Sequence, residues 1–200
     1  MGFGLLLIGY FLMNVLPVIS VFSSAMLLGL PLILVGLYRL SPYHKTFYFS
    51  YFFTYTGIPF ALYYTLYAFG KLGVVPAFAA LGGTLFAVVQ WTYLIWSLAF
   101  HILVLLGVSR LSGELGLYGF QSNAIRNLTF SSIYYVLFLF VRLPFFEAYA
   151  RPFVIPLVIL RYLCIFLNLW LFFRTWQVIL PEGSDAEPPK ERRKEEGKKQ

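Results

Sequence analysis

Long apolar runs separated by short polar breaks fill residues 1–180, and this pattern predicts membrane-spanning helices. The first charged residue is Arg39. An unbroken helix over residues 1–39 would be about 60 Å long, twice the bilayer hydrocarbon thickness of about 30 Å. This stretch therefore has to fold back, and the sequence favours a turn near residues 18–24.

Applied to the whole chain, the pattern predicts an all-α fold, a polytopic transmembrane helix bundle of about six spans. Glycine, proline and polar clusters mark the breaks between spans. The predicted spans are 3–19, 24–40, 46–69, 78–108, 123–142 and 154–180. The longest predicted loop is 109–122. For residues 1–40, one span plus an interfacial helix is the alternative to two spans.

The composition agrees with a lipid environment. The chain is 60% hydrophobic and 12% charged, with a mean hydropathy of +0.78. Soluble domains are about 45–50% apolar and about 25% charged. A soluble fold of this length could not hide so much apolar surface, so lipid is expected to cover part of it. The lipid bilayer is therefore the first predicted partner.

Charge divides the chain into two parts. Residues 181–200 carry six basic and six acidic side chains, so the net charge of +7 belongs to residues 1–180. Residues 181–200 contain almost no apolar side chain, which predicts a disordered, mixed-charge cytosolic tail behind a transmembrane domain at 1–180. A tail without net charge is not a polybasic arm, and no nucleic-acid partner is expected.

The distribution of basic residues predicts the orientation of the spans. With six spans, the termini share one side of the membrane with the second and fourth loops. The basic residues of those two loops are Arg39, Lys45, Arg110 and Arg126, whereas the opposite side has Lys71, Arg142 and Arg151. The tail adds six more to the side of the termini, so the positive-inside rule predicts that both termini are cytosolic.

Polar residues recur on single faces of the predicted spans. A polar side chain facing lipid is costly, so each is expected to face the bundle interior, where together they form a candidate polar seam. The seam comprises Asn14, Thr54, Gln90, Ser97, His101, Asn127, Ser131, Arg161 and Asn168. One interpretation is hydrogen bonding between helices, and the other is a small polar cavity that binds or passes a solute.

Arg161 and Glu147 are the ionisable residues of greatest interest. A charged group inside a span points to function, and a carboxylate at Glu147, a lipid phosphate or helix-end carbonyls are possible partners of Arg161. Alternatively, the last span begins at 161 and Arg161 reaches the interface, with 145–160 re-entrant or interfacial. Glu147 and Arg151 are four residues apart and form a candidate ion pair.

Several kinds of chemistry lack the residues they need. No acidic residue precedes Glu114, which disfavours a carboxylate-coupled pump. The chain has no GxxxxGK[ST], HExxH or GxSxG motif, and its two histidines have no nearby metal ligands. Cys164 is the only cysteine. We therefore predict no catalytic residue, metal site or cofactor. A membrane enzyme would require Glu114, Glu147, His101 or Arg161 to converge.

The opening MGFGLLLIGYFLM and residues 124–140 (AIRNLTFSSIYYVLFLF) resemble small uncharacterised polytopic membrane proteins of clostridial bacteria. The resemblance implies a bacterial cytoplasmic (inner) membrane and says nothing about a site.

Stripes of small residues without catalytic groups favour a non-enzymatic protein that packs with itself as a homo-oligomer or with a membrane partner. A small-solute transporter or channel using the polar seam is the alternative, and a membrane enzyme is the third hypothesis.

Overall fold

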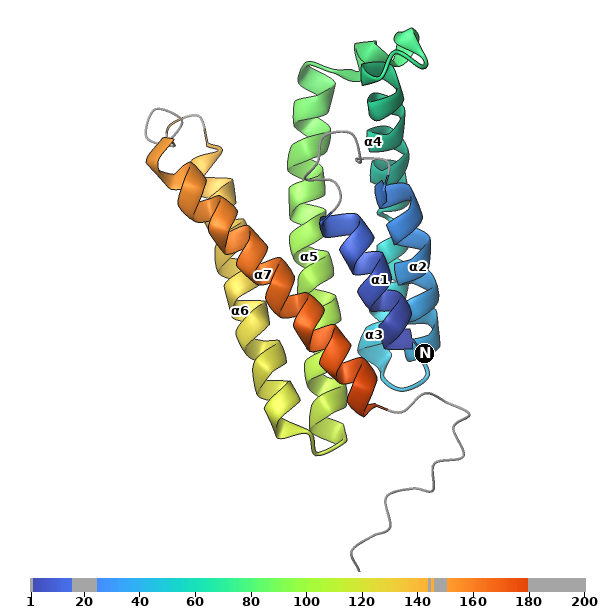
Figure 1. Cartoon of the computed structure of the whole chain (residues 1–200), viewed down its shortest axis with the longest axis vertical. Helices are drawn as coiled ribbons and strands as arrows, with labels where there is room; N and C mark the ends of the chain where they lie inside the picture. The colour runs from blue at the N-terminus through green and yellow to red at the C-terminus, as the bar shows by residue number, and fades with distance from the viewer. Residues whose placement is uncertain (1, 16–24, 144, 146–150, 180–200) are drawn as a thin grey trace, which may run out of the picture.

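The computed structural model describes residues 2–15, 25–143, 145 and 151–179, and within these ranges it is helical, without strands (Figure 1). The predicted turn at 18–24 and the tail at 181–200 both lie outside the described ranges. The helices are α1 (Gly2–Asn14), α2 (Ala25–Leu40), α3 (Lys45–Tyr55), α4 (Ile58–Lys71), η2 (Pro76–Leu81), α5 (Thr84–Glu114), α6 (Tyr118–Val141) and α7 (Arg151–Val178). By length and composition, α5, α6 and α7 can cross a membrane.

The first two helices form a closely packed antiparallel hairpin. Glycines face each other across it: a Cβ added to Gly9 would lie 2.7 Å from the carbonyl oxygen of Gly29, and one added to Gly36 would lie 2.9 Å from that of Gly2. The missing side chains let the two backbones touch. The helices have 13 and 16 residues, so they are about 20 and 24 Å long, shorter than the hydrocarbon core of about 30 Å.

The predicted span 46–69 is two helices rather than one. Pro59 has no N–H with which to continue the helical ladder. Just before it, the N–H groups of Thr56 and Gly57 bond to carbonyls three residues back, at 3.0 and 2.9 Å. Trp96 of α5 packs on this break and donates a 2.9 Å hydrogen bond from Nε1 to the Thr56 hydroxyl. The break between α3 and α4 is therefore held by α5.

The connection between α5 and α6 is much shorter than the loop predicted at 109–122. Only residues 115–117 separate the two helices. Gly116 has φ +70°, a conformation that glycine adopts without steric cost, and it lets the Leu117 N–H reach the Ser112 carbonyl at 2.8 Å. Residues 109–114 therefore belong to α5 and residues 118–122 to α6, and the prediction of a long loop at 109–122 is wrong.

The core lies mainly among α1, α2, α3 and α5, and α6 and α7 add side chains to it; α6 packs on α5, whereas α7 packs on α6 and α1 (Figure 1). Side chains that are fully or almost fully buried fill it: Leu6, Ile33, Leu37, Phe47, Val104, Val108 and Phe172. The outer face of α7 instead exposes large apolar side chains, with Ile155 72% and Phe166 62% exposed. Such faces suit contact with lipid.

Candidate functional site

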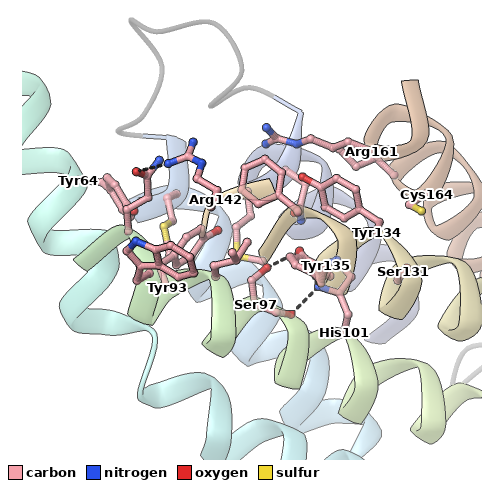
Figure 2. Close-up of a pocket in the computed structure, with 18 of the residues that line it drawn as sticks. Tyr64, Tyr93, Ser97, His101, Ser131, Tyr134, Tyr135, Arg142, Arg161 and Cys164 are labelled. Carbon is pink, nitrogen blue, oxygen red and sulfur yellow. Dashed lines mark hydrogen bonds between the residues drawn. The ribbon is translucent and has the colours of Figure 1, made fainter. Parts of the chain in front are cut away.

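A cavity of about 340 Å³ lies between α4 and α5 on one side and α6 and α7 on the other, with the ends of α1 and α2 also contributing (Figure 2). This volume is at the lower end of the range for small-molecule pockets, about 300–1,000 Å³. Six of the nine predicted seam residues line the cavity: Asn14, Gln90, Ser97, His101, Ser131 and Arg161. The tertiary structure therefore brings together predicted seam residues from four separate helices, α1, α5, α6 and α7.

The wall of the cavity is mostly aromatic. Tyr64 and Tyr67 come from α4, and their rings pack against Tyr93 and Phe86 of α5, with centroids 5.4 and 4.8 Å apart. Phe138 of α6 adds a further ring to the lining. These rings give the cavity a largely apolar surface that can hold the apolar part of a ligand.

A hydrogen-bond network forms and supports the floor. The Tyr10 hydroxyl lies 2.8 Å from His101 Nε2, and the Asn168 amide nitrogen donates to the same hydroxyl oxygen at 3.0 Å. His101 Nδ1 lies 2.7 Å from the Ser97 carbonyl. Because a carbonyl can only accept, Nδ1 carries the proton, and in the neutral ring Nε2 accepts from Tyr10. Asn168 also reaches the Ser131 hydroxyl at 3.4 Å, so the network links α1, α5, α6 and α7.

Most of the remaining polar groups of the floor are also paired, whereas the buried side-chain oxygen of Asn168 has no hydrogen-bond partner among the described residues. The Ser97 hydroxyl bonds to the Tyr135 hydroxyl at 2.5 Å, and the Asn14 amide nitrogen donates to the Tyr10 carbonyl at 3.1 Å. The floor therefore satisfies most of its hydrogen-bonding capacity within the protein, which is what stable burial of polar groups requires.

Two arginines occupy the opposite end of the cavity. Arg142, the residue that ends α6, donates from Nη1 to the Gln90 side-chain oxygen at 2.8 Å and lies 5.0 Å from the Phe138 ring centroid. Arg161 comes from α7 and is partly buried. Figure 2 shows the two arginine side chains at the same end of the cavity, with Arg161 extended toward Arg142 and Arg142 turned to Gln90. We call this end, formed by Arg142, Arg161 and Gln90, the arginine mouth.

No carboxylate lies near the arginine mouth in the parts of the chain that the structure describes. Glu114 is the single acidic residue there, and it lies 3.5 Å from His44. It ends α5, about 36 Å along that helix from Gln90. The mouth is therefore a concentration of positive charge without an opposite charge among the described residues.

Helix α7 settles where the last helix begins. It runs without interruption from residue 151, so Arg161 lies ten residues inside it, about 15 Å from its first residue. The alternative in which the last span begins at 161 stays a prediction, because a continuous helix does not fix where the membrane boundary lies. The candidate ion pair of Glu147 and Arg151 is a separate matter, because Glu147 and the side chain of Arg151 lie outside the described residues.

Three seam residues are not part of the cavity lining. Asn168 lies just beneath the floor, as described above. The Asn127 amide donates across to the Leu167 carbonyl of α7 at 2.9 Å, and Thr54 donates to the Ser50 carbonyl of its own helix at 2.6 Å. Thr54 belongs to the small-residue stripe of α3 and α4, which is buried inside the chain at Ser50, Thr54, Gly57, Ala61, Thr65 and Ala68. That stripe is therefore not available to a partner helix.

Sequence reasoning missed two residues of the site. Tyr10 joins His101 to Asn168, and its position four residues before Asn14, on the same face of a helix, could have indicated it. Arg142 was counted only as a loop charge, although it turns into the cavity. Its role depends on the tilt of α6 against α5, which no local pattern encodes.

The site offers binding chemistry more than reaction chemistry. Within the described ranges, no three His, Cys, Asp or Glu side chains lie close enough to hold a metal ion. His101 bonds to the backbone carbonyl of Ser97 rather than to its hydroxyl, so these residues are not arranged as a nucleophile and its base. Comparison of the chain with protein-family models, curated proteins and solved structures identifies no match.

Proposed function

We propose that this chain is a multi-pass membrane protein that binds a small amphipathic molecule in the cavity between its helices, as a binding protein or carrier. The observation that supports this proposal is the cavity itself, which combines an aromatic wall, a self-paired polar floor and the arginine mouth. A bundle whose only purpose was packing would fill its interior. Because the small-residue stripe of α3 and α4 is buried within the chain, it does not support the hypothesis that this stripe packs against a partner protein.

The proposal includes six passes, with both termini in the cytosol of a bacterial cell. In Figure 1 the start of α1 and the end of α7 lie at the same end of the bundle, together with the ends of α2 and α5. The basic residues on those segments and on the adjoining starts of α3 and α6 are Arg39, Lys45, Arg110, Arg126 and Arg174. At the other end, Lys71 ends α4, Arg142 follows α6 and Arg151 begins α7, so fewer basic residues lie there. The positive-inside rule then supports a cytosolic location for the termini, with α1 and α2 as two short passes.

Cysteine labelling tests this orientation. Ser41→Cys lies between α2 and α3, and Val74→Cys follows α4, each in a Cys164→Ala background. A membrane-impermeant maleimide applied to intact cells should label residue 74 alone and should label residue 41 only after permeabilisation. Labelling of residue 41 in intact cells would refute the orientation.

Native mass spectrometry tests binding in the cavity. Protein in dodecyl maltoside is titrated with dodecyl phosphate and, separately, with dodecylphosphocholine. We expect a saturable one-to-one adduct with at least one of them. Leu94→Trp places bulk in the cavity and should abolish the adduct, whereas the matched variant Ile95→Trp, at a site 58% exposed on the same helix, should retain it. Absence of any saturable adduct, or equal binding by the two variants, would overturn the proposed function.

A further inference from the structure

We infer that the arginine mouth binds a phosphate group and that the occupant of the cavity is a phosphate-bearing amphiphile whose tail lies along the aromatic wall. This inference rests on the proposed function and adds the chemical class of the ligand.

The first argument is unbalanced charge. Arg142 and Arg161 come from different helices and reach the same end of the cavity (Figure 2). Arg161 has no hydrogen bond or ion pair with another described residue, and Arg142 uses one of its five N–H donors on the neutral Gln90. Two converging cations repel each other, more strongly where a bilayer lowers the dielectric, and an anion between them converts that repulsion into attraction.

The second argument is the geometry of guanidinium groups. One arginine can bind both oxygens of a carboxylate through a two-pronged interaction. Two arginines at one end of the cavity, from the end of α6 and from α7, offer two such forks, which suits the three terminal oxygens of a phosphate monoester better than the two oxygens of a carboxylate. The donor set therefore favours phosphate.

The third argument concerns the remainder of the cavity. The floor hydroxyls of Ser97 and Tyr135 bond to each other, and Tyr10 is held between His101 and Asn168, so these hydroxyl groups need no polar partner from a ligand. The wall beside the mouth is aromatic. An apolar tail attached to the phosphate would be removed from water there, which a free phosphate ion cannot exploit.

The test compares head groups on one tail. Binding of dodecyl phosphate, dodecylphosphocholine and inorganic phosphate is measured on the full chain in dodecyl maltoside, by native mass spectrometry and by competition. Because hydrogen bonds to charged groups are involved, Arg161→Gln and Arg142→Gln should each weaken dodecyl phosphate binding roughly 10- to 100-fold. Arg161→Lys keeps the charge and should bind with intermediate affinity. Arg174→Gln removes the same charge about 20 Å farther along α7 and should bind like the unmodified chain.

The outcomes separate this inference from the proposed function. Equal affinity for dodecyl phosphate and dodecylphosphocholine, whose phosphate is a diester, would overturn the phosphate monoester as the head group, and unchanged affinity in both glutamine variants would overturn the phosphate assignment. If Leu94→Trp still abolished that binding, the proposed function would stand. Displacement of dodecyl phosphate by inorganic phosphate at equal concentration would overturn the amphiphile and leave free phosphate as the ligand. Circular dichroism and gel filtration verify that each variant is folded.

Discussion

Replacing Tyr10 by phenylalanine removes one buried oxygen atom while leaving the ring in place. That oxygen lies 2.8 Å from His101 Nε2 and 3.0 Å from the Asn168 amide nitrogen, and the side chain is 1% exposed. The substitution therefore deletes two hydrogen bonds and leaves both partners without an equivalent bond, and it creates almost no cavity. The effect on stability then reports the polar network rather than packing.

The magnitude follows from these two bonds. Hydrogen bonds between membrane helices average about 0.6 kcal/mol, and typical intramolecular bonds reach about 1.5 kcal/mol, so two bonds predict a loss of about 1–3 kcal/mol. The assay is reversible unfolding in dodecyl maltoside micelles titrated with sodium dodecyl sulfate, followed by circular dichroism. Tyr118→Phe is the matched control, because Tyr118 is 73% exposed, and its free energy of unfolding should not change.

A double-mutant cycle sharpens the test. If Tyr10 and Asn168 interact directly, Tyr10→Phe combined with Asn168→Leu should cost less than the sum of the single variants, by about 0.6 kcal/mol and at most about 1.7 kcal/mol. Our reasoning about the network would be refuted if Tyr10→Phe matched the unmodified chain within about 0.3 kcal/mol, or if the two effects were simply additive.

Three further substitutions test the helix contacts by the same unfolding assay. Gly9→Ala puts a methyl group 2.7 Å from the Gly29 carbonyl oxygen of α2 and should destabilise the protein by about 1–3 kcal/mol. Gly119→Ala is the control, because its methyl group meets nothing within 4 Å, and it should be neutral or stabilising. Equal effects of the two substitutions would contradict the close packing of α1 against α2. Gly116→Ala forces a side chain into the left-handed region at φ +70° and should cost about 1–2 kcal/mol, so a neutral result would contradict the turn geometry. Trp96→Phe removes the 2.9 Å hydrogen bond to Thr56 and should lower the free energy of unfolding by at least about 0.6 kcal/mol. An unchanged free energy of unfolding would mean that α5 does not stabilise the break between α3 and α4.

The local pattern of the sequence was informative about helices and poor at their ends. The predicted span 78–108 starts too early, because α5 begins at Thr84, directly after the glycine pair at 82–83. The polar, glycine-containing stretch 109–122 was predicted as a loop, yet most of it is helical. Ser109 and Ser112 are buried there, so tertiary packing overrode the weak helix preference of serine and glycine. Pro59 carried the signal for the break between α3 and α4, which the predicted span 46–69 ignored.

By itself, the sequence determined that the chain is helical and that several helices are apolar enough for a bilayer, because hydropathy and run length follow directly from residue types. It also marked most of the polar side chains that line the cavity, because such groups cannot face lipid cheaply. Only the tertiary structure decided which of them meet. Tyr10 reaches Asn168 across 158 positions of sequence, and Arg142 reaches Gln90 across 52. Those encounters depend on the tilt and close approach of whole helices, and a one-dimensional pattern does not contain them.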